Sequence, residues 1–270
     1  MGGRLKGKVI VVVGGTTGLG LSAAQACIAE GAMVVVVGRH EQNACAAEDQ
    51  LGEASRAVTG DAIVPETTVT AIATAIEQFG SFGGLYHVAG GSGRRWGDGA
   101  LDEISDEGWQ KTVDLNLTSI FNSNRAAARQ FLRQETGGSV LNMSSVLADS
   151  PSPRYFATHA YATTKAAAIG LTTAAAAYYA KQNIRFNVIA PALVETPLTE
   201  RATSDEATMQ YIQTKQPLDG GRIGTSTDVD AAVVYLLSDE SRFVTGQVLR
   251  IDGGWSVTEG QYGPRMTNDQ

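Results

Sequence analysis

A tyrosine and a lysine at helical spacing are the residues of this sequence best suited to acid–base chemistry. The stretch YFATHAYATTK covers residues 155–165, and Lys165 follows Tyr161 at the spacing that places two side chains on one helical face. A tyrosine in water has a pKa near ~10 and is a poor base at neutral pH. An ammonium group nearby favours the phenolate, so the sequence predicts that Lys165 lowers the pKa of Tyr161. Tyr155 has only His159 at that spacing and is expected in a loop or substrate pocket.

Two serines precede this pair at the end of a predicted strand. The sequence NMSSV places Ser144 and Ser145 directly after the apolar run 139–143. Open α/β sheets bind their ligands outside the carboxyl ends of the strands. A serine hydroxyl at that edge could donate a hydrogen bond to a substrate carbonyl and stabilise charge that develops on its oxygen.

A glycine-rich turn follows the first predicted strand. The sequence GGTTGLG covers residues 14–20, between the apolar run 9–13 and a helical stretch over 19–30. Glycines permit a tight turn and a close approach of the backbone, and the helix offers free N–H groups to a pyrophosphate. The pattern predicts a dinucleotide site; a purely structural turn is the alternative.

The end of the second predicted strand bears on the choice of dinucleotide. An acidic residue there usually binds a free ribose 2′-hydroxyl, whereas a 2′-phosphate requires a cation. The sequence VVVVGRH places Gly38 and Arg39 at this point. A guanidinium can form two hydrogen bonds with a phosphate, so NADP(H) is the expected cofactor. Glu41 keeps NAD(H) open as a cofactor, and a merely solvated Arg39 is the other interpretation.

Short β-branched runs alternate with helical stretches along the chain, which predicts βαβ units. We expect an α/β fold, a single Rossmann-type doubly wound parallel sheet of about seven strands with helices on both faces. Strands are expected at 9–13, 33–37, 57–59, 84–89, 139–143, 184–190 and 247–251. Helices are expected over 19–30, 41–51, 66–79, 105–133, from 159 onwards and over 227–237, with an irregular stretch before the last of them.

The composition is that of a globular protein, with 43% hydrophobic and 18% charged residues among 270. Without a linker or repeat, residues 1–270 are expected to form one NAD(P)-binding domain with a short irregular tail at 256–270. The net charge of −7 disfavours nucleic acid or a membrane surface as a partner. The apolar N-terminal run is too short for a signal peptide or a membrane span. Cys27 and Cys45 form no metal-binding pattern, which favours a cytoplasmic, metal-free protein.

Together these motifs resemble the short-chain dehydrogenase/reductase family in its compact, single-domain, 3-oxoacyl reductase-like form. The resemblance extends from Lys8 to Trp255, and the motifs occur in the family's order. They are GGTTGLG, GD at 60–61, VAGG at 88–91, DLNLTS at 114–119, NMSS, YATTK, PALVETP at 191–197 and VTGQVLRIDGGW at 244–255. The resemblance implies an NAD(P)-dependent oxidoreductase that transfers a hydride between nicotinamide and a carbonyl or secondary alcohol.

The resemblance also implies roles for individual residues. Ser145 would be the catalytic serine and Tyr161 the acid/base. Lys165 would bind the nicotinamide ribose and lower the pKa of the tyrosine, and Asn116 would hold a proton-relay water through its local backbone. The dinucleotide would contact Gly14, Thr16, Thr17, Gly18, Leu19, Gly20, Arg39, Asp61, Ala62, Ala89, Gly90, Tyr161, Lys165, Pro191, Val194 and Thr196.

The chain departs from the family pattern in three places. Val13 stands where the family usually has threonine, and His87-Val88 stand where it has two asparagines. We interpret the two changes as one coupled replacement of hydrogen bonding by apolar packing between neighbouring strands. His87 is expected to be a structural histidine rather than a catalytic one. The stretch from 146 to 160 is longer than is usual and is expected to form an enlarged loop beside the substrate.

The substrate is less defined by the sequence than the chemistry. NADPH-dependent reduction of a ketone or a 3-oxoacyl group is the expected reaction. An NAD-dependent dehydrogenase of a diol, sugar or steroid, a non-catalytic dinucleotide-binding regulator, and an epimerase or dehydratase are the alternatives. Segments 91–103 and 199–221 are expected to cover the substrate, with Arg94 and Arg95 either binding an anionic group or facing solvent. The family commonly forms homotetramers, here through helices 105–133 and 159–182 and the segment 247–255.

Overall fold

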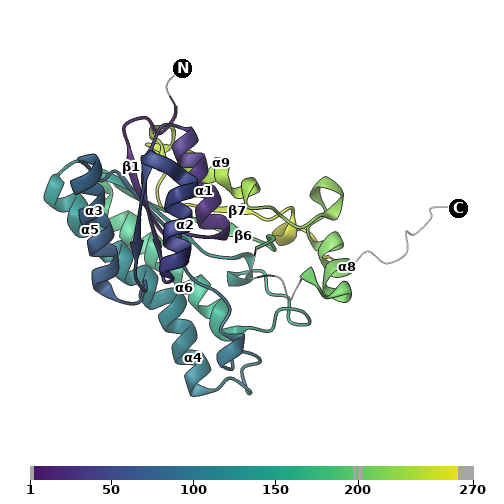
Figure 1. Ribbon diagram of the computed structural model, residues 1–270. Coiled ribbons are helices and arrows are strands. Elements are labelled where there is room, and N and C mark those ends of the chain that lie inside the picture. Colours follow the sequence, from purple (N-terminus) through teal and green to yellow (C-terminus); the bar gives the residue numbers. More distant parts are fainter. Residues whose placement is uncertain (1–2, 197–198, 200–202, 261–270) are drawn as a thin grey trace, which may run out of the picture.

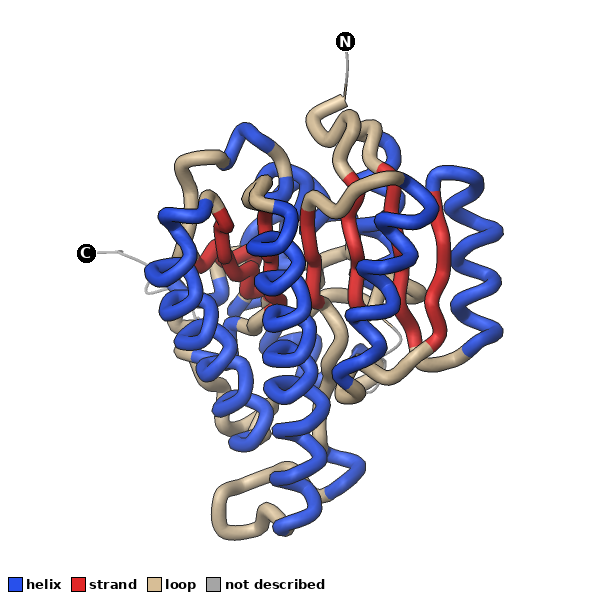
Figure 2. Tube along the Cα trace, turned by 90° about the vertical axis from the view of Figure 1, so that its left-hand side faces the viewer, coloured by secondary structure: helices blue, strands red, loops and turns tan. Residues whose placement is uncertain are grey.

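A sheet of seven parallel strands forms the centre of the computed structural model, which describes residues 3–196, 199 and 203–260. The strand order is β3-β2-β1-β4-β5-β6-β7, and Figure 2 shows the strands side by side behind a layer of helices. The predicted doubly wound sheet and its seven strands are confirmed. The strands are β1 (Val9–Val13), β2 (Met33–Gly38), β3 (Ser55–Thr59), β4 (Gly84–His87), β5 (Gly138–Met143), β6 (Ile184–Pro191) and β7 (Val248–Ile251).

Helices cover both faces of the sheet (Figure 1). One apolar cluster joins the sheet to α1 (Gly18–Ala29), α2 (Glu41–Leu51) and α9 (Thr227–Leu237). A second cluster joins the opposite face to α3 (Pro65–Phe79), α5 (Ser119–Gln134) and α6 (His159–Tyr179). Successive residues of β1 alternate between the two clusters, because side chains along a strand point to opposite faces. This explains why β1 is apolar at every position.

The predicted long helix over 105–133 consists of three parts. α4 (Asp106–Val113) begins at Ser105, whose side chain accepts a hydrogen bond from the Gly108 N–H at 3.0 Å. A π-helical segment, Asp114–Thr118, separates α4 from α5. Such wider turns interrupt the regular hydrogen-bond ladder and frequently occur at functional sites. In Figure 1, α4 extends below the sheet layer.

The expectation of an irregular stretch before α9 is wrong, because it contains α8 (Glu206–Lys215). Asp205 caps this helix by accepting a hydrogen bond from the Thr208 N–H at 2.6 Å. Ile212 is the fully buried apolar residue of α8 and packs in a cluster with Trp255. α8 has a short apolar face, so its sequence shows little helical periodicity. The helix is stabilised mainly by packing against a segment that is distant in the sequence.

The hypothesis of a coupled apolar change at Val13 and Val88 is wrong. The two side chains belong to the clusters on opposite faces of the sheet. The strands are joined at this point by backbone hydrogen bonds of 2.9 Å from the Val88 and Ala89 N–H groups to the Val13 carbonyl.

His87 is structural, as expected. Its ring is fully buried and lies 2.7 Å from the Ser123 hydroxyl, 3.3 Å from that of Ser119 and 3.1 Å from the Ala89 carbonyl. Burial, together with the nearby Lys165 ammonium, lowers the pKa of His87 to about 3. The ring is therefore neutral at physiological pH and ties β4 to α5.

The two ends of the chain are described only in part. Of the predicted irregular tail at 256–270, Ser256 and Val257 belong to a short 3₁₀ turn (Trp255–Val257), and residues 261–270 lie outside the described residues. Within the described residues, no helix is long and apolar enough to cross a membrane, and no group of histidine, cysteine, aspartate and glutamate side chains could hold a metal ion.

Candidate active site

Two adjoining cavities open at the carboxyl ends of the central strands. The first has a volume of about 340 Å³ and lies at the ends of β1 and β2. The second has a volume of about 240 Å³ and lies at the ends of β5 and β6. Both are lined by Leu19, Val88, Gly90 and Thr196. The strand order reverses between β1 and β4, and this switch point is where open α/β sheets bind ligands.

Glycines shape the floor of the first cavity, which we call the dinucleotide cavity. Gly14 has φ +90°, and a Cβ atom there would lie 2.6 Å from the Ala89 nitrogen. At Gly20 a Cβ atom would lie 2.0 Å from the Gly14 carbonyl oxygen. Any side chain at either position would force β1, β4 and α1 apart. Thr17 is the N-cap residue of α1, yet its side chain makes no capping hydrogen bond, which suits an end that binds phosphate.

The residues predicted to contact the dinucleotide all line one of the two cavities. The dinucleotide cavity is lined by Gly14, Thr16, Thr17, Gly18, Leu19, Gly20, Arg39, Asp61, Ala62, Ala89, Gly90 and Thr196. The second cavity is lined by Tyr161, Lys165, Pro191 and Val194, as well as Leu19, Gly90 and Thr196.

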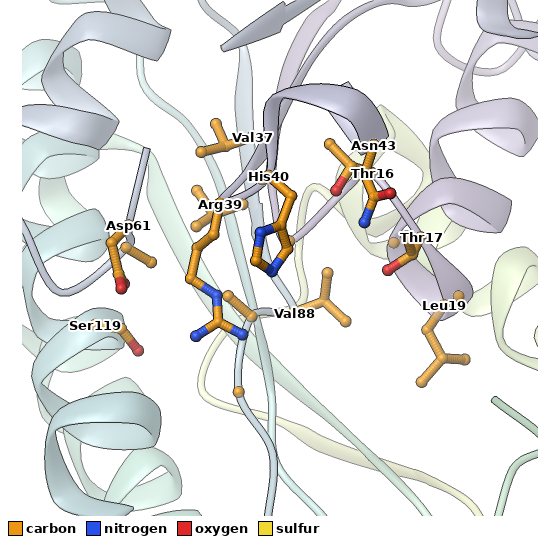
Figure 3. A pocket seen from close by; sticks show the side chains of 18 of the residues that line it. Thr16, Thr17, Leu19, Val37, Arg39, His40, Asn43, Asp61, Val88 and Ser119 are labelled. Carbon is orange, nitrogen blue, oxygen red and sulfur yellow. The ribbon is translucent and has the colours of Figure 1, made fainter. Parts of the chain in front are cut away.

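Arg39 extends into the dinucleotide cavity from the end of β2. Figure 3 shows Arg39 and His40 between Asp61 on one side and Thr17 on the other. Arg39 is exposed and forms no hydrogen bond or ion pair with the part of the chain that the structure describes. Its guanidinium is therefore available for a ligand.

Sequence reasoning missed three further polar residues of this cavity, His40, Asn43 and Ser119. His40 directly follows Arg39 and Asn43 lies in the first turn of α2, so their closeness to Arg39 in the chain was their signal. Ser119 is the last residue of the DLNLTS motif. Gly38 has a separate reason to be glycine, because a Cβ atom there would lie 2.2 Å from the Thr16 hydroxyl.

Ser145, Tyr161 and Lys165 meet in the second cavity, which we call the reaction cavity. The Tyr161 phenol lies beside the Ser145 hydroxyl, which accepts a hydrogen bond from the Leu147 N–H at 3.2 Å. The Lys165 ammonium lies 5.5 Å from the centre of the Tyr161 ring and donates a hydrogen bond to the Met143 carbonyl at 3.1 Å. Ser144 also lines the cavity, but its hydroxyl donates to the Lys165 carbonyl at 2.8 Å and joins α6 to the end of β5.

The prediction that Lys165 lowers the pKa of Tyr161 is wrong. Burial raises the pKa of Tyr161, and the Ser145 hydroxyl opposes that effect without overcoming it. Burial also lowers the pKa of Lys165 to about 8, because a desolvated ammonium is less stable. Both side chains are therefore shifted towards their neutral forms.

Asn116 lies in the π-helical segment and lines neither cavity. Its side-chain amide donates to the carbonyls of Gly91 at 2.9 Å and Thr112 at 3.0 Å, and its oxygen accepts from the Gly91 N–H at 2.9 Å. The fully buried side chain is thus committed to backbone groups. Any part that Asn116 plays in proton transfer must run through the backbone that it holds.

Apolar side chains form the far wall of the reaction cavity. Leu147, Phe156, Leu193 and Trp255 line it and belong to one cluster. Phe156 comes from the long loop after Ser145, which confirms that this loop lies beside the cavity. Sequence reasoning did not single out Phe156, Leu193 or Trp255, which come from three distant segments.

Aromatic stacking joins the long loop to α8. The Tyr155 ring stacks on Tyr211 of α8 with centroids 4.4 Å apart, and Tyr211 in turn meets Trp255 edge-on at 5.9 Å. Tyr155 therefore supports the cavity wall from a loop.

The two arginines of segment 91–103 lie in different surroundings. Arg94 lines the reaction cavity, whereas the exposed Arg95 stacks on the Trp96 ring at 3.9 Å.

Known proteins resemble the chain over most of its length. A family model described as enoyl-(acyl carrier protein) reductase matches residues 13–256. The 2,5-dichloro-2,5-cyclohexadiene-1,4-diol dehydrogenase LinX of Sphingobium indicum is 34% identical, over 95% of this chain and 99% of that protein.

Two solved structures share the fold. One is a short-chain type dehydrogenase/reductase from Mycobacterium ulcerans, with 32% identity, a TM-score of 0.86, and coverage of 94% of this chain and 92% of the other. The second is a 3-ketoacyl-(acyl-carrier-protein) reductase from Brucella melitensis in complex with NADH, with 26% identity, a TM-score of 0.82, and coverage of 94% and 100%.

This chain therefore belongs to the short-chain dehydrogenase/reductase family. It is an oxidoreductase of the NAD(P)-dependent kind that acts on alcohols or ketones.

Proposed function

We propose that the chain reduces ketones or 3-oxoacyl groups with NADPH and uses Tyr161 as the general acid. One observation carries the proposal. A hydroxyl, a phenol and an ammonium group converge in an apolar cavity that adjoins a glycine-lined dinucleotide cavity. A regulator that only binds dinucleotide has no need of the hydroxyl and the phenol beside an apolar pocket.

The residues of the reaction cavity divide the work on the substrate oxygen. A nicotinamide cofactor held in the dinucleotide cavity would supply the hydride for the carbonyl carbon. Ser145 donates a hydrogen bond to the carbonyl oxygen and stabilises its developing charge. Tyr161 transfers its phenolic proton to that oxygen, and the Lys165 ammonium stabilises the phenolate that remains. Asn116 would hold, through its local backbone, the relay water that returns a proton to Tyr161. Alcohol oxidation uses the same groups in reverse.

The wall of the reaction cavity favours a substrate with an apolar body. Phe156, Leu193 and Trp255 offer no hydrogen bond to a sugar within the cavity, since the Trp255 indole N–H is taken by the Ser150 carbonyl at 3.1 Å. A polyhydroxylated substrate would leave the hydroxyls that face this wall without partners. The Sphingobium relative is named for a ring alcohol, and an NAD-dependent dehydrogenase of such alcohols is the second candidate.

A substrate panel tests the reaction. The rate of NADPH consumption, with NADH in parallel, is measured against alicyclic and aryl ketones, 3-oxoacyl thioesters and sugars, and alcohols are tested with NADP⁺ and NAD⁺. We expect turnover of apolar ketones with NADPH. Turnover confined to alcohols with NAD⁺ would favour the second candidate, and binding of both cofactors without any turnover would favour a regulator.

Arg39 provides a test of cofactor choice. We expect Arg39→Ala to raise the dissociation constant for NADPH by about tenfold and to leave that for NADH unchanged, because only NADPH carries the 2′-phosphate. Fluorescence titration measures both constants, and Arg95→Ala is the control for removal of an exposed arginine. An unchanged NADPH constant in Arg39→Ala would contradict the assignment and favour NAD(H), the cofactor type in the Brucella complex.

The remaining proposals concern assembly and location. The free faces of α5 and α6 and strand β7 carry exposed apolar side chains that a tetramer would cover, Phe121, Leu132, Tyr178 and Leu249. Light scattering should therefore give four times the chain mass of 28.3 kDa, and a monomer would remove this proposal.

Two free cysteines are consistent with the cytoplasm, and fractionation of producing cells tests that location.

A further inference from the structure

Asp98 is a buried carboxylate that contacts the first turn of the helix carrying Tyr161. Its side chain belongs to a residue only 5% exposed. One carboxylate oxygen accepts a hydrogen bond from the Ala160 N–H at 3.0 Å, and the other accepts from the Tyr161 N–H at 3.0 Å. The adjacent Gly99 carbonyl accepts from the His159 N–H at 3.1 Å. The first three amides of α6 have no acceptor inside their own helix, and all three are satisfied by residues 98 and 99.

Thr158, the N-cap residue of α6, does not accept hydrogen bonds from these N–H groups. Thr158 is of a type that often caps helices, and a capping side chain usually accepts from the second or third helical N–H. Here the Thr158 hydroxyl makes no cap and donates to the Phe156 carbonyl at 3.4 Å. Asp98, which is 62 residues before Ala160, takes its place. The start of α6 is therefore placed by a distant segment.

The same segment is attached at its other end to Asn116. Gly91 donates its N–H to the Asn116 side-chain oxygen and accepts from the Asn116 amide, both at 2.9 Å. Residues 91–99, which we call the 91–99 segment, thus connect the π-helical segment to the first turn of α6. Two residues assigned to proton transfer, Asn116 and Tyr161, share this one connection.

Close packing limits the freedom of the 91–99 segment. A Cβ atom at Gly93 would lie 1.7 Å from the Thr112 hydroxyl, so the backbone lies directly against α4. At Gly108 of α4 a Cβ atom would lie 2.6 Å from the Gly97 carbonyl carbon. The Ser105 hydroxyl also donates to the Trp96 carbonyl at 3.1 Å. A displacement of Asp98 would therefore be transmitted to α6 rather than absorbed by the segment.

We propose that Asp98 is a positioning residue, which holds Tyr161 in register with Ser145 and Asn116 through the first turn of α6. The proposal rests on the assignment of Tyr161 as the acid/base. A carboxylate suits the position because it offers two acceptors to two N–H groups, whereas an asparagine amide would direct an NH₂ donor at one of them. Its negative charge also lies at the positive end of the helix dipole.

The charge of Asp98 gives the proposal a signature in the pH profile. Among the described residues, Lys165 and Arg94 are the charged groups that line the reaction cavity. The Ser145 hydroxyl lies beside the Tyr161 phenol, and His159 is the first residue of α6. A carboxylate near Tyr161 disfavours the phenolate, so its removal lowers the phenol pKa. Reduction requires the protonated phenol. The alkaline limb of kcat therefore moves to lower pH when the charge is lost.

The test compares Asp98→Asn with Asp102→Asn, which removes an exposed carboxylate nearby. Melting temperature, the NADPH dissociation constant, kcat, KM and the pH profile are measured on each. We expect Asp98→Asn to lower kcat about tenfold, to change KM and NADPH binding less than twofold, and to shift the alkaline limb downward. Asp102→Asn should match the wild type. Asp98→Glu keeps the charge but moves the carboxylate, so it should lower kcat and leave the limb in place.

Each outcome decides between the proposals. If Tyr161→Phe is inactive while Asp98→Asn has wild-type kcat and pH profile, the positioning role is wrong and the reductase assignment stands. If Tyr161→Phe remains active, the reductase assignment itself fails. If Asp98→Asn does not fold, Asp98→Glu decides, and a wild-type kcat in that variant would overturn the positioning role.

Discussion

Replacement of Tyr161 by phenylalanine should lower kcat for carbonyl reduction by about 10³-fold while the protein still folds and binds NADPH. The change removes one hydroxyl that lies beside Ser145 in the reaction cavity. General acids in well-formed sites contribute roughly 10²–10⁴-fold to the rate. Single-turnover reduction at saturating NADPH measures the effect on the chemical step.

Tyr155→Phe is the matched control for this experiment. It removes a phenol hydroxyl six residues earlier in the chain, from a ring that stacks on Tyr211 behind the cavity wall. We expect its kcat to remain within about twofold of the wild type, since aromatic stacking does not depend on the hydroxyl. Equal losses in the two variants would assign the effect to packing and remove Tyr161 from the chemistry.

The raised pKa of Tyr161 also sets the direction of pH dependence. Because burial keeps the phenol protonated through neutral pH, the rate of reduction should be flat in that range and fall only at alkaline pH. Alcohol oxidation needs the phenolate, so its rate should rise with pH over the same range. Initial rates in both directions measure this, and a reduction rate that falls between pH 6 and ~7 would contradict the assignment.

Replacement of Lys165 by methionine should lower activity and raise the stability of the cofactor-free protein. We expect kcat to fall about 10²-fold and the NADPH dissociation constant to rise about tenfold, because a charged hydrogen-bond donor to the ribose and a stabiliser of the phenolate are both lost. Lys181→Met removes an exposed lysine at the end of the same helical run and is the control. Activity within threefold of wild type in Lys165→Met would contradict the role.

The stability effect follows from the pKa of Lys165, about 8 in the fold and about 10.4 in an unfolded chain. Between these values the unfolded state binds more protons, so the free energy of unfolding of the wild type rises with pH over that window. Below pH ~8 Lys165 is charged in the folded protein, so the cost of burying its ammonium then lowers the free energy of unfolding in full. At pH 7 the methionine variant should be more stable by about 1–2 kcal/mol, after the loss of the hydrogen bond to Met143.

Urea denaturation at pH 7 and pH 10 measures this difference. The gain in the methionine variant should shrink at the higher pH, because the wild-type lysine is then neutral in the fold. A gain that is the same at both values would show that packing, not charge, distinguishes the two side chains.

Much of the site could be predicted because its determinants are local. The uninterrupted apolar run of β1, the glycines at 14 and 20 and the Tyr161–Lys165 spacing each reflect a requirement within a few residues of the chain. Strands that are parallel must bring their carboxyl ends to one edge. Local patterns and this topological rule were sufficient to place the predicted dinucleotide residues around two adjoining cavities.

The sequence alone determined the order of the strands along the chain, the glycine turn and the chemical identity of Ser145, Tyr161 and Lys165. The tertiary structure decided what depends on distant neighbours. Burial reversed the expected pKa shift of Tyr161, Trp255 and Ile212 brought α8 to the cavity wall, and Asp98 became the cap of a helix 62 residues later. Desolvation and long-range hydrogen bonds leave no periodic trace in a sequence, because they arise only when separate segments are packed together.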